Sequence, residues 1–195
     1  ETQFPEHEKL VILRPDPVLG NQIKSHFLAI QSFKRPHNIV TIIDSDNLTH
    51  PAYLTGLNKW FNRGFKAVQG VRAAKNTNTE YASLDAVNEL YYLFYDRKIL
   101  FGIGSSCMLS GSGMAFSTSL YKECLEHSSS TGAGFDKILQ KEILLRKHRI
   151  AFAEDAIVYD EKTASADQLV KQRARWINTW FRYSKFGFLL MSKGM

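Results

Sequence analysis

Apolar runs and helix-spaced apolar positions alternate along this chain. Short apolar runs predict strands at 10–13, 39–43, 65–73, 150–153 and 156–159. Apolar residues three and four positions apart predict helices at 20–33, 51–62, 83–97, 117–126, 136–148 and 166–193. Strands that alternate with helices are typical of an α/β fold, so we expect a mostly parallel, Rossmann-related sheet flanked by helices. With no internal repeat visible, residues 1–195 are expected to form one domain that ends in a long amphipathic helix.

The most informative strand is the apolar run Ile39–Ile43, which leads directly into Asp44-Ser45-Asp46. Continuous branched apolar residues predict a strand buried on both faces. Side chains alternate along a strand, so Asp44 and Asp46 should project the same way at its carboxyl end, where α/β sheets bind ligands. Paired carboxylates suit Mg²⁺ or Mn²⁺ that is shared with a phosphate group. The alternative is that Asp46 caps a turn and Asp44 is solvated.

Composition narrows the class of partner. The 195 residues are 44% hydrophobic and 23% charged, as expected of a folded domain, and the net charge of +6 favours anionic partners. No Lys/Arg-rich run or nucleic-acid motif is present. Two cysteines, Cys107 and Cys124, predict neither a disulfide framework nor a metal cluster, and they fit a reducing compartment. Neither a signal peptide nor a full transmembrane stretch is visible, and the start at Glu1 suggests an excised piece.

The last predicted helix carries a second set of candidate binding residues. Gln172, Arg175 and Trp176 are spaced i, i+3, i+4, so they share one helical face. An amide, a guanidinium and an indole on one face can bind a phosphate and stack on a sugar. They could equally be a surface arginine beside a core tryptophan. The helix beyond Trp180 is apolar but interrupted by cations, so it suits either a membrane interface or the core.

Two further segments hold candidates that admit more than one interpretation. The predicted loop 99–116 contains Gly111 and Gly113, which could let the backbone approach a ligand or could simply be flexible. Asp136 opens a helix, so it could be a general base, an N-cap, or both. Glu154 and Asp155 follow the run at 150–153 and are interpreted as a surface turn.

Taken in order, these motifs resemble glycosyltransferase family 2. The resemblance runs from about residue 10 to 180, and it rests on four segments: Asp44-Ser45-Asp46, Gly111-Ser112-Gly113, Gly134-Phe135-Asp136-Lys137 and Gln172-x-x-Arg175-Trp176. It is closest to the membrane-associated branch of polysaccharide synthases and N-acetylglucosaminyltransferase-like enzymes, which includes cellulose, chitin and hyaluronan synthases. Gly134-Phe135-Asp136 stands where these relatives usually have Thr-Glu-Asp.

The resemblance implies a role for each candidate residue. A GT-A fold would bind a nucleotide-sugar donor and a divalent cation, Mg²⁺ or Mn²⁺, and Asp136 would be the catalytic base. Asp46 together with Asp44 would bind the metal. The implied donor-binding residues are Lys24, Asp44 and Arg175. The implied acceptor-binding residues are Gly111, Gly113, Gln172 and Trp176.

The resemblance also implies an overall function. We expect an inverting, metal-dependent glycosyltransferase that moves a sugar, expected to come from a UDP-sugar, to a glycan or lipid-linked acceptor at the cytoplasmic face of a membrane. The two N-terminal strands that shape the nucleobase site in relatives are missing from the pattern, so this chain alone is expected to be weakly active. The alternative is a catalytically inactive module that binds a nucleotide sugar or a glycan and acts with a partner.

Overall fold

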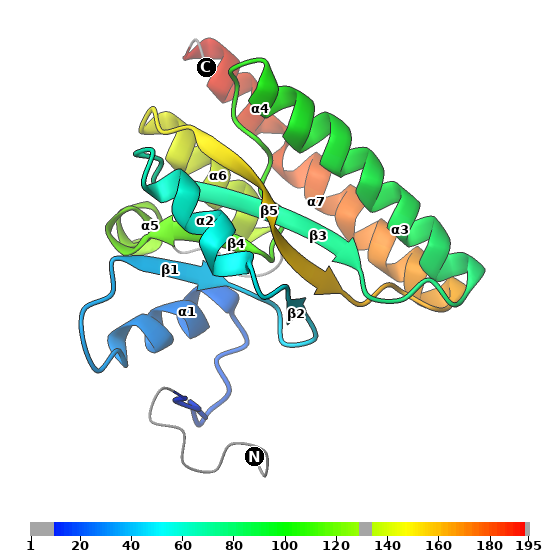
Figure 1. The fold of residues 1–195 in the computed structure, drawn as a ribbon, viewed down its shortest axis with the longest axis horizontal. Helices are drawn as coiled ribbons and strands as arrows, with labels where there is room; N and C mark the ends of the chain where they lie inside the picture. The colour runs from blue at the N-terminus through cyan, green and yellow to red at the C-terminus, as the bar shows by residue number, and fades with distance from the viewer. Residues whose placement is uncertain (1–9, 129–133, 194–195) are drawn as a thin grey trace.

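The computed structural model describes residues 10–128 and 134–193 and shows a five-stranded sheet between layers of helices (Figure 1). The strands are β1 (Ile39–Ile42), β2 (Leu48–Thr49), β3 (Ala67–Ala74), β4 (Met114–Ser117) and β5 (Ile150–Asp160). The α-helices are α1 (Gln22–Gln31), α2 (Tyr53–Phe61), α3 (Glu80–Tyr92), α4 (Leu100–Gly102), α5 (Thr118–Leu125), α6 (Phe135–Leu145) and α7 (Ala166–Ser192). A π-helical segment, η1 (Leu93–Ile99), joins α3 to α4.

The sheet is mixed, with strand order β1-β4-β3-β5-β2. Strand β4 pairs antiparallel with both β1 and β3, β2 pairs antiparallel with β5, and only β3 and β5 pair in parallel. Strands β1, β3 and β5 therefore run in one direction, and β2 and β4 run in the other. The expected α/β fold with flanking helices is confirmed, although β4 lies inside what was predicted to be a glycine-rich loop and makes the sheet mixed rather than mostly parallel.

Two strand predictions need correction. Strand β1 lies at the edge of the described sheet and pairs only with β4, so it is not buried on both faces; Ile39 remains 38% exposed while Ile42 is buried. Leu10–Leu13 forms no strand, and its four side chains are exposed. A strand needs a neighbouring strand to accept its backbone hydrogen bonds, and no described strand lies beside this segment.

The two strands predicted at the end of the chain are a single strand, β5, with a bulge. Glu154 and Asp155 are exposed in the bulge rather than in a turn between two strands. Opposite it, the register shifts between Gly70 and Val71. A Cβ atom on Gly70 would lie 2.3 Å from the Ala156 carbonyl oxygen, so only glycine allows the bulged backbone to approach this closely.

Apolar residues on the two faces of the sheet form two cores. Alternate residues of one strand divide between them: Ala67 belongs to the core that α5 and α6 cover, and Val68 belongs to the core under α2. The first core includes Phe116, Leu139 and other fully buried side chains. Burial of each large apolar side chain stabilises the fold by about 1.5–3 kcal/mol, so these cores hold the sheet edge that carries the site.

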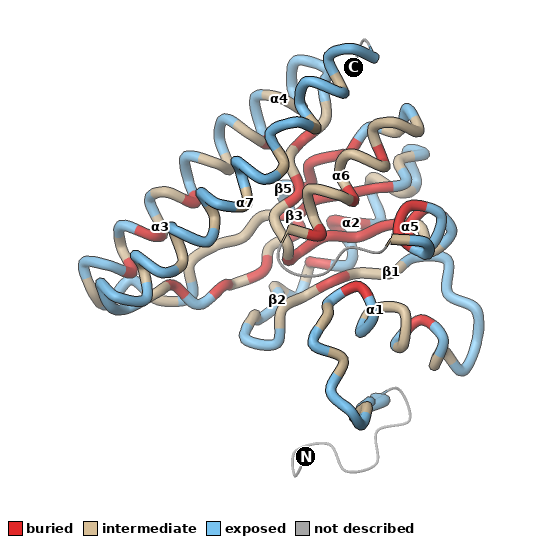
Figure 2. The backbone as a smooth tube through the Cα atoms, turned by 180° about the vertical axis from the view of Figure 1, so that it is seen from behind, coloured by how far each residue is buried: buried red, intermediate tan, exposed pale blue. Residues whose placement is uncertain are grey.

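The helices α3 and α7 extend beyond the sheet side by side (Figure 2). Helix α7 is 27 residues long and has no fully buried residue. Within 10–128 and 134–193, no helix is both long and apolar enough to cross a membrane. The first half of α7 instead closes one side of a cavity at the carboxyl ends of β1, β3 and β5.

Candidate active site

A cavity of about 390 Å³ opens where the sequence placed the candidate site. Strands β1, β3 and β5 run the same way, so their carboxyl ends meet at one sheet edge. Asp44 and Asp46 follow β1, Arg72 lies near the end of β3, and Asp160 ends β5; all four line the cavity. The remaining walls come from the start of α1, the end of α3 with η1, the loop before β4, the start of α6 and the first half of α7.

Hydrogen bonds through Ser112 and Asn47 hold the segment that carries Asp44 and Asp46. The Asp44 backbone N–H donates to Ser112 Oγ at 3.0 Å, and the side chain of Asn47 lies 2.7 Å from the same hydroxyl. With its amide oriented so that the oxygen accepts from Ser112, the Asn47 nitrogen donates to Asp46 Oδ1 at 2.8 Å and to Asp160 Oδ1 at 3.1 Å. Ser112 and Asn47 thus connect the backbone of Asp44 with the carboxylates of Asp46 and Asp160.

The environment of Asp44 favours a positive ligand. Burial raises the pKa of this carboxyl, the guanidinium of Arg72 lowers it, and the charges of Asp46 and Asp160 raise it again. The net direction is upward. A cation placed between Asp44 and Asp46 would remove this repulsion.

The donor set fits a divalent cation that is shared with a phosphate. In the part of the chain that the structure describes, no group of three His, Cys, Asp or Glu side chains is close enough to enclose a metal ion. Mg²⁺ typically binds one or two carboxylates and completes its shell with water and substrate phosphate oxygens. Asp44 and Asp46 supply such a partial shell, which would add Lewis-acid stabilisation of a leaving diphosphate when the ion and the donor bind together.

Two arginines, which the sequence analysis did not identify, form the floor of the cavity; Arg97 is buried and Arg72 is partly buried. Arg97 is 1% exposed and donates to Glu89 at 2.8 Å. Arg72 pairs with Asp160 and also donates to the Ser110 carbonyl oxygen at 2.9 Å. The Nε atoms of both arginines are buried without a hydrogen-bond partner.

Ion pairs hold both arginines in place. Lys162, which does not line the cavity, also donates to Asp160, at 2.9 Å, so three cations share the carboxylates of Glu89 and Asp160. Burial alone would raise the pKa of Glu89, but Arg97 and the other cations outweigh it and lower that pKa. Carboxylates nevertheless outnumber cations in the lining of the cavity as a whole, so a bound cation would reduce the excess of negative charge. Arg72 could have been identified from the sequence, because it is a charged residue inside the strand predicted at 65–73.

Asp136 lies in the first turn of α6 and lines the cavity. The N-cap position belongs to Gly134, with φ of +97°, so the N-cap interpretation of Asp136 is wrong. Asp136 makes no hydrogen bond or ion pair with any residue in the described parts of the chain, so its carboxylate is free to accept one from a ligand. A Cβ atom on Gly134 would lie 2.4 Å from Tyr183, which shows how closely α7 packs on this turn.

The predicted face of α7 turns toward the cavity. Gln172, Arg175 and Trp176 all line it, and Gln172 Oε1 is buried without a hydrogen-bond partner. Arg173 points elsewhere, donating to Asp85 at 2.6 Å with its guanidinium 4.6 Å from the centre of the Trp176 ring. The spacing i, i+3, i+4 therefore placed three side chains correctly.

The cavity includes all but two of the predicted site residues. Gly111 lines it, whereas Lys24 is exposed on α1 and lies outside it. Gly113 is buried in the sheet, where its N–H donates to the Ile42 carbonyl oxygen at 2.9 Å and its own carbonyl oxygen accepts from Gly70 at 2.8 Å. The structure gives Gly113 a role in joining strands, and the donor role of Lys24 stays a prediction.

Comparison with known proteins adds one match. Residues 1–179 match the family described as "Glycosyltransferase like family 2". A search of the curated proteins found no match. The family match covers all four motifs that suggested the resemblance, and the α/β sheet with its long C-terminal helix is consistent with a GT-A-like fold.

Proposed function

The chain belongs to glycosyltransferase-like family 2, which implies a nucleotide-sugar donor and an acceptor, and from this premise we propose an inverting, divalent-metal-dependent sugar transfer. One observation carries the proposal. Carboxylates after β1, a free carboxylate on α6 and a Gln-Arg-Trp face on α7 line the same cavity. The three segments are remote in sequence, so their convergence is a property of the fold.

The donor would bind at the Asp44 end of the cavity. Asp46 and Asp44 would hold Mg²⁺ or Mn²⁺ against the diphosphate of a UDP-sugar. Arg175 lies exposed on the α7 side, where its guanidinium can approach the same phosphates. A bound metal ion would offset the carboxylates of the lining and would stabilise the departing diphosphate.

The acceptor would bind between α6 and α7. Its hydroxyl oxygen forms a bond to the anomeric carbon of the donor as the bond from that carbon to the diphosphate breaks. The hydroxyl proton passes to the Asp136 carboxylate, and attack from the opposite face inverts the configuration. Trp176 offers a surface for stacking on a sugar ring, and the unpartnered Oε1 of Gln172 can accept from a sugar hydroxyl.

We also propose that the enzyme works at the cytoplasmic face of a membrane. The second half of α7 exposes Phe181, Phe188 and Met191, with Lys185 between them. Exposed aromatic and aliphatic side chains with nearby cations suit an anionic lipid surface.

The proposed function is tested by thermal stabilisation with a panel of nucleotide sugars, with and without Mn²⁺. A UDP-sugar at 100 times its dissociation constant stabilises by about 2.7 kcal/mol, which raises the Tm by roughly 5–11 °C for a chain of this length. Asp46→Ala should abolish the Mn²⁺-dependent part of the shift. Asp155→Ala, which removes an exposed carboxylate in the β5 bulge, should leave it intact.

Two results would contradict the proposal. A Mn²⁺-dependent shift that survives Asp46→Ala would refute the metal assignment. Binding without any turnover of donor and acceptor would instead favour a module that binds nucleotide sugars without transferring them.

A further inference from the structure

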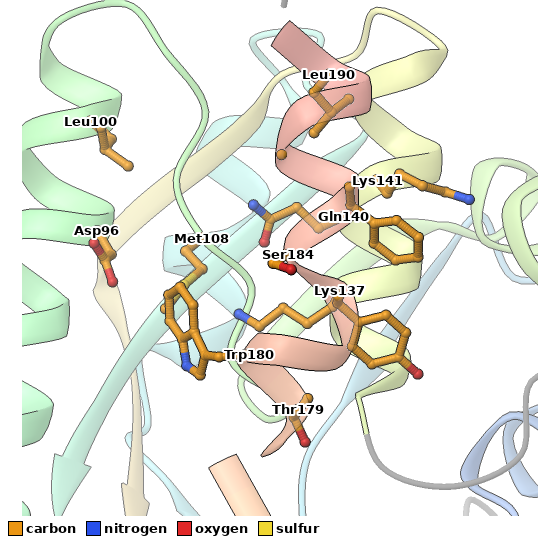
Figure 3. A pocket seen from close by; sticks show the side chains of 13 residues that line it. Asp96, Leu100, Met108, Lys137, Gln140, Lys141, Thr179, Trp180, Ser184 and Leu190 are labelled. Atoms are coloured by element: carbon orange, nitrogen blue, oxygen red, sulfur yellow. The ribbon is translucent and has the colours of Figure 1, made fainter. Parts of the chain in front are cut away.

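A second cavity, the side groove, lies next to the active-site cavity (Figure 3). It has a volume of about 340 Å³ and is lined by α7, by α6, and by η1 with α4. Leu100 forms part of one wall, Trp180, Gly187 and Leu190 line the other, and Met108 lies on the floor. Most of this lining is apolar, unlike the charged cavity beside it.

The side groove and the active-site cavity are continuous. Met108, Lys137, Thr179 and Trp180 line both. Asp136, the proposed base, immediately precedes Lys137 on α6 and faces the active-site cavity. A molecule whose reactive hydroxyl lies at Asp136 can therefore extend past Lys137 into the side groove.

Lys137 provides a positive charge at this junction, near the carboxylates of Asp96 and Asp136. Its ammonium lies 5.1 Å from the centre of the Trp180 ring, and it forms no hydrogen bond or ion pair with a described residue. Asp96 faces the groove from η1 but forms no ion pair with Lys137. The other lysine of the groove, Lys141, forms an ion pair with Glu142 at 2.6 Å. A partly desolvated ammonium without an ion-pair partner favours an anionic group on the ligand.

The far end of the groove favours a hydrocarbon over a sugar. Close to Leu100 and Leu190 in the sequence, the apolar side chains of Ile103, Phe188 and Met191 are exposed. Both views of the fold place α4 and the end of α7 at the same corner (Figures 1 and 2). A glycan in this position would leave most of its hydroxyl groups facing apolar atoms, whereas a hydrocarbon chain would not.

We infer that the side groove binds the hydrocarbon chain of a lipid-linked acceptor, with the lipid phosphate at Lys137 and the acceptor sugar at Asp136. This inference rests on the proposed function, since it specifies which class of acceptor the transferase uses. The sugar hydroxyl gives its proton to Asp136 and takes the donor sugar, while the phosphate and the chain remain unchanged and serve only to position it.

Calorimetric titration with three probes distinguishes the contribution of the lipid phosphate from that of the hydrocarbon chain. Farnesyl phosphate has both the phosphate and a chain, farnesol has only the chain, and glucose 1-phosphate has no chain. We expect farnesyl phosphate to bind at least tenfold more tightly than either. Lys137→Met should reduce its affinity to that of farnesol, and Lys122→Met, on the exposed side of α5, should not.

A second variant tests the groove itself. A Cβ atom on Gly187 meets nothing within 4 Å, so Gly187→Leu should fill the groove without disturbing α7. It should weaken farnesyl phosphate binding at least tenfold, whereas Gly102→Leu, at an equally open helical glycine outside the groove, should not. Unchanged farnesyl phosphate binding in Gly187→Leu, equal affinity for farnesol and farnesyl phosphate, or displacement of farnesyl phosphate by cellotetraose would each overturn the inference.

Binding of UDP with Mn²⁺, measured on the same proteins, keeps this inference separate from the proposed function. Normal UDP binding with no farnesyl phosphate binding would refute only the lipid acceptor. Absent UDP binding would refute the proposed donor site, whatever the lipid probes show.

Discussion

The buried pair of Glu89 and Arg97 offers the sharpest test of how the cavity floor is held. Their side chains are 7% and 1% exposed and meet at 2.8 Å. Glu89→Ala would leave the Arg97 charge buried without the carboxylate that it contacts. Breaking a buried pair in this way costs about 3–5 kcal/mol. For a domain of 195 residues this lowers the Tm by roughly 6–20 °C.

The matched control is Glu154→Ala. Glu154 accepts from Lys98 at 2.9 Å, but these side chains are 55% and 51% exposed. An exposed pair contributes only about 0.2–1 kcal/mol, so the Tm should fall by at most roughly 4 °C. Both variants are compared with the native protein by urea denaturation and by thermal melting at pH 7. Similar losses in the two variants would refute the claim that burial makes the Glu89 pair different.

The same pair predicts a pH dependence with a definite sign. The native fold lowers the pKa of Glu89 below its ordinary 4.5, so the carboxylate stabilises the folded state above pH 4.5. This stabilisation is lost as the pH falls through the native pKa. The stability gap between the native protein and Glu89→Gln should therefore be constant from pH 7 to about pH 5 and narrow below pH 4.5. A gap that widens on acidification would show that the sign is wrong.

Three other predictions concern the site and the core. Asp136→Asn should reduce sugar transfer by a factor on the order of 100 with donor affinity unchanged, as measured by turnover and calorimetry; loss of both together would assign it a structural role. Gly134→Ala should destabilise the fold by about 1–3 kcal/mol because of its φ of +97° and its contact with α7, whereas Gly187→Ala should be neutral or stabilising in the same denaturation assay. Burial raises the pKa of Cys107 to about 12 and that of Cys124 to about 11, so iodoacetamide at pH 8 should label neither until the protein unfolds, as checked by mass spectrometry.

Local patterns predicted the elements and the separate motifs well. Helical spacing put Gln172, Arg175 and Trp176 on one face, and that face does line the cavity. The apolar run before Asp44 predicted a strand that ends at the site, which β1 does. Both predictions depend only on the geometry of a single helix or strand, which the sequence of that segment determines.

Local sequence patterns could not predict which strands pair or which charged side chains are buried. Nothing local in the segment 114–117 indicates that it inserts between β1 and β3, because that position depends on partners 72 to 78 residues away in β1 and 45 to 49 residues away in β3. Glu89 and Arg97 lie within the helix predicted at 83–97. As charged residues of a helix, they would be expected at the surface. Their burial follows from the π-helical segment and from packing against the sheet, which only the assembled fold shows.

The insertion of β4 beside β1 also determines when the Asp44 end of the cavity, the proposed donor site, can form during synthesis. Strand β1 has no sheet partner until Ser117 has been added, 75 residues after Ile42 (117 − 42). At about 5–20 residues per second this takes roughly 4–15 s. The Asp44 loop needs the same event, because its N–H is held by Ser112.

A nascent chain therefore carries an unpaired apolar strand for seconds before the proposed metal site can form. Such an edge can pair with another chain during that interval, so aggregation should depend on the rate of synthesis as well as on the final stability. Binding of a metal ion by the loop that carries Asp44 would therefore indicate that the sheet is complete, because helices can form before the sheet does.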